Sequence, residues 1–109
     1  MASNTFMLSY TVSRKETPYY DVDDATHWAK HVRDHIPSIK QDWDTHNGVE
    51  TTLTGTMNLY GFYDKVGAAK AHISKEITPL FEGVPRKYKP DVLCVLVVNG
   101  VDEVIKFTL

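Results

Sequence analysis

The chain has 109 residues, 42% of them hydrophobic and 24% charged, a composition typical of a folded globular protein and unlike that of a disordered chain. This length suits one domain, which we expect over residues 1–109, because such a chain buries about two-thirds of its unfolded surface. The formal net charge of −2 gives no overall attraction to nucleic acid or to an anionic membrane, so such binding would need a local basic patch.

The cysteine content and the N-terminus bear on the compartment. Cys94 is the single cysteine, so the chain can form no internal disulfide, which suits a reducing environment. The first residues lack the basic and apolar segments of a secretion signal, and no stretch reaches the about 18 apolar residues of a membrane span. We therefore expect a cytoplasmic protein that does not contact a membrane.

The first third of the chain predicts a strand and a helix. Apolar and polar side chains alternate over residues 6–13, which indicates a strand with one apolar face. A polar loop with a proline follows at residues 14–20. Asp21 is a natural N-cap, and apolar residues recur after it at helical spacing until Pro37. These apolar positions are Ala25, Trp28, Ala29, Val32 and Ile36.

The middle of the chain predicts a hairpin and a second helix. Residues 39–45 could form a short polar strand, and Asn47-Gly48 predicts a tight turn into an alternating strand over residues 49–60. Asp64 can cap a helix whose apolar face ends near Pro79. That face contains Val66, Ala69, Ile73 and Ile77.

The last part of the chain is dominated by seven consecutive apolar residues, 92–98. Such a run, bounded by turn residues, is typical of a strand with both faces covered. Asn99-Gly100 then predicts a hairpin with a type I′ turn, in which both central residues need positive φ. A final one-sided strand is expected over residues 101–109.

This element order predicts an α+β fold: a ferredoxin-like plait (split βαβ), βαββαβ with an extra C-terminal strand, in the spatial order 4-1-3-2. Two helices would cover one face of the antiparallel sheet. The other face would be polar, except where the strand over residues 92–98 presents apolar side chains. A second copy of the chain, or another protein, is the simplest cover for that apolar strip.

Basic and aromatic residues gather in loops that this topology brings to one end of the sheet. They come from the loop after the first strand, the first hairpin turn and the loop before the fourth strand. These candidate binding residues are Arg14, Lys15, Tyr19, Tyr20, His46, Arg86, Lys87, Tyr88 and Lys89. The mixture suits phosphate, a nucleic-acid backbone or an acidic protein surface. The alternative is an ordinary set of polar loops, because Asp21, Asp91 and other nearby acids would cancel much of the field.

Three histidines of the first helix, His27, His31 and His35, are spaced four residues apart and share one side with Asp24. Two of them could clamp a divalent metal ion, although a third clear ligand is missing, or they could make association sensitive to pH. An ordinary solvent-exposed helix face is favoured over both.

Asp42 and Asp44 share one face of the predicted short strand and could bind Mg²⁺ or act in acid–base chemistry, but an exposed hairpin commonly carries such charges. The sequence contains no phosphate-binding loop, nucleophile elbow, zinc-protease or dinucleotide motif. We therefore predict no cofactor and favour a protein that is not an enzyme.

The element order resembles that of three families. The RNA-recognition motif would need stacking aromatic residues on the open face of its strands, where this chain has non-aromatic residues, namely Met7, Ser9, Thr11, Thr52, Thr54 and Thr56. Small CRISPR-associated nucleases and antitoxins have a similar length, but the nucleases would place an Asp where Ser13 and its neighbours stand. The dimeric α+β barrel enzymes are similar in the second helix, through Ala68, Ala69, Ala71 and His72. No family is assigned.

The predicted function is a small interaction module that binds another protein or a second copy of itself through the sheet, in a regulatory, adaptor or inhibitory role. The first alternative is nucleic-acid or phosphate binding through the basic and aromatic loops. The second is an enzyme or ligand carrier of the dimeric α+β barrel type, with its cavity between two sheets.

Overall fold

A computed structural model describes residues 3–46 and 49–109 as an α+β fold with one five-stranded antiparallel sheet and two α-helices. The strands are β1 (Asn4–Ser13), β2 (Asp44–His46), β3 (Val49–Met57), β4 (Asp91–Val98) and β5 (Ile105–Thr108). The helices are α1 (Val22–His35) and α2 (Lys65–Ile77). Short 3₁₀ helices lie at Tyr19–Asp21, Ile36–Ser38, Thr78–Phe81 and Arg86–Tyr88. The predicted α+β class is confirmed.

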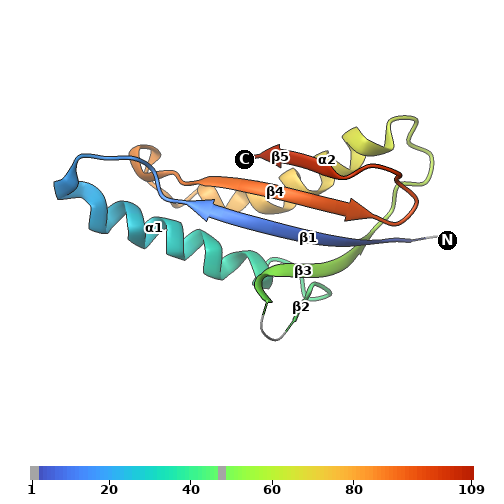
Figure 1. Ribbon diagram of the computed structural model, residues 1–109, viewed down its shortest axis with the longest axis horizontal. Coiled ribbons are helices and arrows are strands. Elements are labelled where there is room, and N and C mark those ends of the chain that lie inside the picture. Colours follow the sequence, from blue (N-terminus) through green and yellow to red (C-terminus); the bar gives the residue numbers. More distant parts are fainter. Residues whose placement is uncertain (1–2, 47–48) are drawn as a thin grey trace.

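The sheet is built around β1, with the strand order β2-β3-β1-β4-β5 (Figure 1). Each neighbouring pair of strands is antiparallel. Leu8 of β1 lies between Leu53 of β3 and Leu96 of β4. Because side chains alternate along a strand, residues two positions away share the face of these leucines. That face forms the hydrophobic core.

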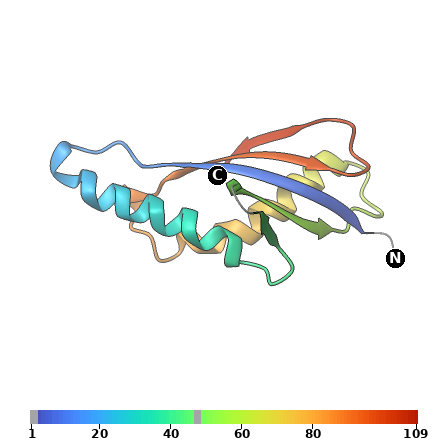
Figure 2. The same ribbon diagram turned by 60° about the horizontal axis from the view of Figure 1, so that its bottom comes forward.

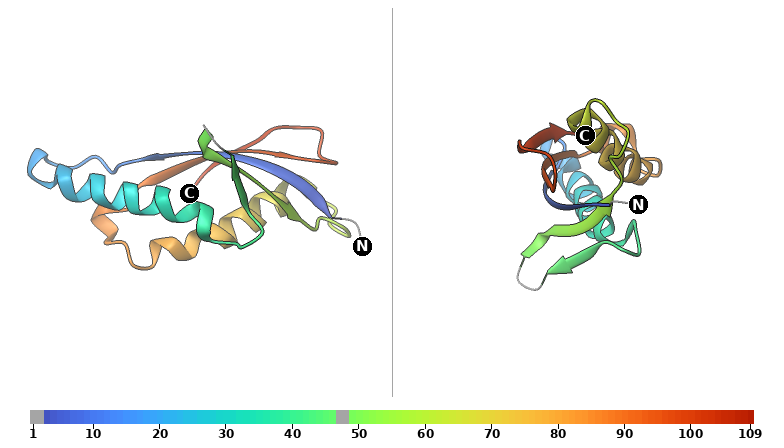
Figure 3. Two further views of the ribbon diagram at one scale, coloured as in Figure 1. Left: turned by 90° about the horizontal axis from the view of Figure 1, so that it is seen from below. Right: turned by 90° about the vertical axis from the view of Figure 1, so that its right-hand side faces the viewer.

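Both α-helices lie on the core side of the sheet (Figure 2 and the left view of Figure 3). The helix positions predicted from apolar spacing are the buried ones, apart from Trp28 and Val66, which are partly exposed. The buried helical residues are Ala25, Ala29 and Val32 of α1 and Ala69, Ile73 and Ile77 of α2. As expected, α1 ends just before Pro37 and α2 just before Pro79, each continuing into a 3₁₀ turn. No helix within residues 3–46 and 49–109 has the length and apolar character needed to cross a membrane.

The two predicted helix caps behave differently. Asp64 is an extended N-cap whose carboxylate accepts a hydrogen bond of 2.9 Å from the Gly67 amide, as predicted. Asp21 precedes α1 but makes no side-chain cap bond, because it ends a 3₁₀ turn with φ −104° and ψ 2° instead of the extended backbone that capping needs. Its carboxylate accepts a hydrogen bond from Tyr88 instead.

Within a single chain β4 is covered on one face, and cover of its other face by a second copy or another protein stays a prediction. Its burial alternates: Val92, Cys94, Leu96 and Val98 are buried, whereas the side chains between them point to the other face. Leu93 and Val97 are 47% and 48% exposed. The reason is that both α-helices cover the same face of the sheet, so the apolar side chains on the opposite face have no cover among the described residues.

The β4–β5 hairpin is confirmed, but its turn differs from the prediction. Of the two central residues of the turn, only Gly100 has positive φ, at 91°, so the turn is not type I′. The Val101 amide donates to the Val98 carbonyl oxygen at 3.1 Å. Asn99 is held by the N-terminal strand: its amide donates to the Thr5 carbonyl oxygen at 2.8 Å. The connection is longer than predicted, because β5 begins only at Ile105.

The predicted strand over residues 39–45 is mostly absent from the described part of the chain, where β2 covers only Asp44–His46. The preceding segment forms turns, closed by hydrogen bonds such as that from the Trp43 amide to the Lys40 carbonyl oxygen at 3.2 Å. The predicted Asn47-Gly48 turn lies outside the described residues.

Candidate functional site

The face of the sheet opposite the helices, here called the open face, carries an apolar strip. Met7 of β1 lies beside Val97 of β4, and Leu93 lies two rows further along β4. Met7 is 51% exposed, similar to Leu93 and Val97. The side chain of Val95, between them, is partly buried. Three large apolar side chains on adjacent strands, each about half exposed, form a contiguous patch of the kind that marks an interaction surface.

Hydroxyl groups occupy the open face next to the strip. Ser9 lies opposite Thr52, and their hydroxyl oxygens are 3.0 Å apart in a hydrogen bond. Thr54 and Thr56 continue this row along β3, and Thr5 lies opposite Thr56. The predicted polar character of this face is therefore present, and its threonine methyl groups allow it to pack against an apolar surface as well as against water.

An open cavity of about 510 Å³ lies at the corner of the open face near β2. Its walls combine apolar side chains with hydroxyl and carboxylate groups. They are formed by Thr5, Phe6, Met7, Asp42, Asp44, Thr54, Gly55, Thr56, Val97, Val98 and Asn99. Asp42 precedes β2, so the two aspartates do not share a strand as predicted, yet both line this cavity. A volume of this size falls in the range of small-molecule sites, about 300 to 1,000 Å³.

Two of the three predicted basic and aromatic loops meet at one end of the molecule (Figures 1 and 3). The Tyr88 hydroxyl lies 2.9 Å from Asp21 Oδ1 and 3.4 Å from Asp24 Oδ2. The hydrogen bond to Asp21 raises the pKa of Tyr88 above its ordinary value. Tyr88 therefore fastens the loop before β4 to the start of α1, and this places two carboxylates among the predicted binding residues.

The lysines of the loop before β4 lie over aromatic rings. The Lys87 ammonium is 4.8 Å from the centre of the Tyr88 ring, and the Lys89 ammonium is 4.5 Å from that of Phe81. Both distances fit cation–π contacts. Arg86 is exposed beside them. These contacts hold the side chains of the two lysines against the surface of the protein. The role of this loop in binding stays a prediction.

The remaining predicted loop residues are more dispersed. Lys15, Tyr19 and Tyr20 are exposed, and the two tyrosine rings pack edge to face with centroids 6.1 Å apart. Arg14 lines a small surface cavity next to α1 together with Arg33. The side chain of His46 lies outside the described residues. The predicted binding set is thus assembled in part, around Tyr88.

The predicted histidine stripe forms a chain of ring contacts along α1. Trp28 packs edge to face against His27, at 5.2 Å, and against His31, at 5.5 Å. The rings of His31 and His35 are closer, at 4.2 Å. Within the described residues, no group of three or more His, Cys, Asp or Glu side chains is arranged to hold a metal ion.

His72 of α2 lies apart from this stripe. Burial lowers its pKa below the ordinary value, and its Nε2 atom is buried without a hydrogen-bond partner in the structure. Trp43, which sequence reasoning placed on a strand without a role, is 5% exposed and packs against Phe6 with ring centroids 6.0 Å apart. In the sequence Trp43 lies between Asp42 and Asp44, the two aspartates that line the cavity. The glycine in the alternating strand, Gly55, is the sequence feature that could have indicated a large side chain packed against this position.

No family model, curated protein or solved structure matches this chain.

Proposed function

We propose that this chain is a small, non-enzymatic protein-interaction module that associates with a second copy of itself through the open face of its sheet. The observation that carries the proposal is the apolar strip of Met7, Leu93 and Val97, three side chains about half exposed on adjacent strands. Leaving this patch in water costs about 25 cal/mol per Å² of apolar surface, which a covering surface would recover.

The fold that fits this proposal is the ferredoxin-like plait. Its support is the strand order β2-β3-β1-β4, with α1 following β1, α2 following β3, and β5 added beside β4. We also propose a cytoplasmic location, because Cys94 is buried and free, as is usual in a reducing compartment.

The size of the open face suits a dimer. Strands spaced about 4.8 Å apart, with the lengths of β1 to β5 at about 3.3 Å per residue, give a face of about 500 Å² in flat projection. Pleating and side chains raise its accessible area further. A stable interface buries about 600 to 1,000 Å² on each partner. Sheet-on-sheet packing would therefore use most of this face.

The charges at the edges of the open face favour a second copy as the partner. Lys106 lies opposite Val95 at the β5 edge, and Asp44 lies opposite Thr54 at the β2 edge. A two-fold axis parallel to the strands, near β1, brings the β5 edge of one copy over the β2 edge of the other. Lys106 of each copy then faces the acidic edge of its partner, with the apolar strips between them.

Sedimentation equilibrium over a range of protein concentrations tests the proposal. The wild-type chain is expected to be a dimer, and Val97→Lys a monomer, because the substitution places a charge in the centre of the strip. Tyr63→Lys is the matched control, since Tyr63 is a fully exposed aromatic residue outside the sheet, and it should remain a dimer. Circular dichroism would check that each variant is folded. Two results would show that the open face is not the interface. One is a wild-type chain that is still monomeric at about 100 µM, because its dimer would then be weaker than most specific complexes. The other is a Val97→Lys chain that remains a dimer.

Exchanging the edge charges tests the orientation. Lys106→Asp and Asp44→Lys should each weaken the dimer, and the double variant should regain affinity because the opposite charges face each other again. If the double variant dimerises no more tightly than the summed free-energy losses of the two single variants predict, the two-fold axis is placed wrongly.

The cavity favours a second candidate function, that of a ligand carrier. The partner sheet would cover its open side, and the apolar wall beside Asp42 and Asp44 suits a small molecule with an apolar body and a hydrogen-bond donor. Native mass spectrometry of the purified dimer tests this, since a ligand would add a discrete mass that Thr54→Trp should displace. A dimer without added mass, when presented with such small molecules, would count against it.

A further inference from the structure

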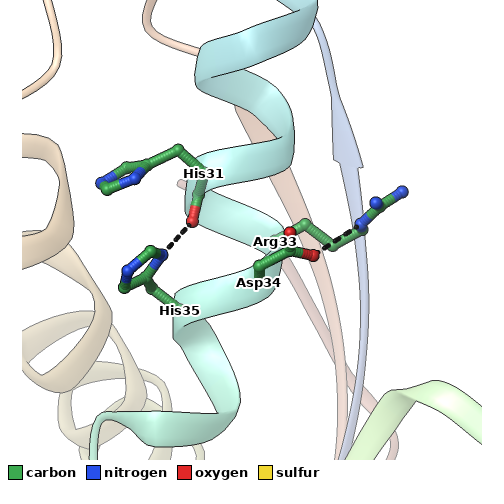
Figure 4. Close-up of polar contacts among 4 residues, drawn as sticks. All are labelled: His31, Arg33, Asp34 and His35. Atoms are coloured by element: carbon green, nitrogen blue, oxygen red, sulfur yellow. Dashed lines mark hydrogen bonds and ion pairs between the residues drawn. The ribbon is translucent and has the colours of Figure 1, made fainter.

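The side chains of His31 and His35 lie together on one side of α1 (Figure 4). Their ring centroids are 4.2 Å apart, with the ring planes tilted by 39°. His35 is exposed and His31 is partly exposed, so both rings can be reached from solvent. Residues four apart on a helix are neighbours on its surface, which explains why these two imidazoles meet.

A hydrogen bond fixes the His35 ring. Its Nδ1 atom lies 2.7 Å from the His31 carbonyl oxygen. Because a carbonyl oxygen can only accept, Nδ1 carries the hydrogen, and in the neutral ring the lone pair is on Nε2. Histidines that bind metals usually donate their other ring N–H to a carbonyl or a carboxylate in this way. His35 is thus held as an Nε2 ligand.

The surroundings of His31 suit the same role. Its ring packs edge to face against Trp28, with centroids 5.5 Å apart, which restricts its orientation. The nearby cation, Arg33, is paired with Asp34 at 3.4 Å and lies on another side of α1 from the two rings (Figure 4). No positive side chain among the four residues drawn there lies between the imidazoles.

We propose that His31 and His35 bind a divalent transition-metal ion that prefers imidazole ligands, such as Cu²⁺, Ni²⁺ or Zn²⁺. Metal–nitrogen bonds of about 2.0 to 2.1 Å require two ligating nitrogens about 3 Å apart. Rings 4.2 Å apart reach that separation by small side-chain rotations. Because the described residues supply no third ligand, water completes the coordination sphere, and Cu²⁺ binds most tightly of the three.

Trp28 provides a direct measurement. Cu²⁺ bound at His31 would lie close to the Trp28 indole, so titration with Cu²⁺ in a buffer without amines should quench its fluorescence. The variant Trp43→Phe leaves Trp28 as the only indole and serves as the background for this titration. Calorimetric titration with Ni²⁺ and Zn²⁺ gives the affinity without relying on fluorescence.

The chain offers a matched control. His27 lies one turn before His31 and packs against the adjacent Trp28, and no contact with a second imidazole is seen for its ring. His31→Ala and His35→Ala are each expected to weaken binding by at least about tenfold, since one imidazole remains. His27→Ala should bind as the wild-type chain does. The same metal concentration should also raise the melting temperature of the wild-type chain and of His27→Ala by more than that of either single-ligand variant.

Three results would overturn the proposal: no binding by the wild-type chain, binding by His31→Ala or His35→Ala as tight as that of the wild-type chain, or a loss in His27→Ala as large as in those two variants. The last two would place the metal elsewhere on the chain. The site lies on the helix side of the molecule, so its failure would leave the proposal about the open face unaffected.

Discussion

Replacing Gly55 of β3 by alanine is expected to destabilise the protein, although alanine normally suits a strand better than glycine. A Cβ atom at this position would lie 2.7 Å from Cδ1 of Trp43 and 2.8 Å from Cε1 and Cζ of Phe6. Carbon atoms pack best at about 3.5 to 4.0 Å, so the added methyl group would overlap both rings. The Trp43 and Phe6 rings are nearly buried, pack edge to face and cannot move into solvent without losing this contact.

The expected cost follows from two opposing contributions. Overpacking a core typically costs about 1 to 3 kcal/mol. Removing glycine from a strand returns about 0.5 to 1 kcal/mol, because the unfolded chain becomes less flexible. The net loss in free energy of unfolding should therefore be about 1 kcal/mol, which for a domain of this size lowers the melting temperature by about 5 °C.

Urea unfolding and thermal melting would measure this loss, and Gly83→Ala is the control. Gly83 has ordinary φ and no atom within 4 Å of its added Cβ, so that variant should be as stable as the wild-type chain or slightly more stable. If Gly55→Ala matches Gly83→Ala in both measurements, the Trp43 ring does not occupy the space over Gly55. The position of β2, which Trp43 holds against β3, would then need another explanation.

Two further predictions concern the loop before β4 and the buried cysteine. If that loop binds nucleic acid or phosphate, Arg86→Glu with Lys87→Glu should abolish the binding and leave the fold intact; an unchanged nucleic-acid affinity would show that the loop is not the site. Burial raises the pKa of Cys94 to about 12, so its thiol should react with a disulfide reagent at pH 8 only as fast as the fold opens, and at once in denaturant. By the same shift, stability should fall as the pH rises from about 9 toward 12, since the unfolded chain loses the thiol proton first. Rapid labelling of the native chain would contradict the burial of Cys94.

The helices could be predicted from the sequence because their signals are local. The apolar spacing of α1, its end before Pro37 and the Asp64 cap of α2 each involve residues within a few positions of one another. Such short-range patterns survive in almost any tertiary context. The alternation of β1 and β3 is local in the same sense.

The errors arose where a distant residue decides the outcome. Asp21 lies in a 3₁₀ turn whose backbone does not suit capping, and its carboxylate accepts a hydrogen bond from Tyr88, 67 residues further along the chain. The Asn99-Gly100 turn departs from type I′ where the Asn99 amide bonds to the carbonyl oxygen of Thr5, which is near the other end of the chain but beside Asn99 in the sheet. Neither partner can be recognised from the local sequence, since the pairing depends on which segments the fold brings together.

The run of apolar residues in β4 was ambiguous for a different reason. An unbroken apolar strand is expected both in a sheet covered on two faces and in a sheet whose second face is covered by another molecule. Hydrophobicity alone cannot distinguish these cases, because it measures the tendency to be covered and not the identity of the cover. The exposure of Leu93 and Val97 within one chain removes the first case.

The candidate site residues also divide into those that local sequence spacing predicts and those that depend on distant segments. The spacing of His31 and His35 identified them as neighbours, but only the structure shows the hydrogen bond from His35 Nδ1 to the His31 carbonyl oxygen that fixes the orientation of one ring. The cavity was not predicted, because it combines residues from β1, β3, β4, the start of β2 and the segment before it. Gly55, one of its wall residues, lies against the rings of Trp43 and Phe6, a contact that no periodic pattern encodes.

The two proposed surfaces lie on opposite sides of the same sheet, and this arrangement has a physical consequence. Both α-helices bury their apolar sides against one face, so the exposed His35 and the partly exposed His31 stay accessible to solvent whether or not the open face is covered. A second copy on the open face would contact side chains of β1, β3, β4 and the edge strands and would leave the two imidazoles accessible. Coupling between the sites would require the sheet itself to change shape, and its buried leucines pack too closely to allow this at little cost. Self-association and metal binding are therefore expected to be independent properties of one small fold.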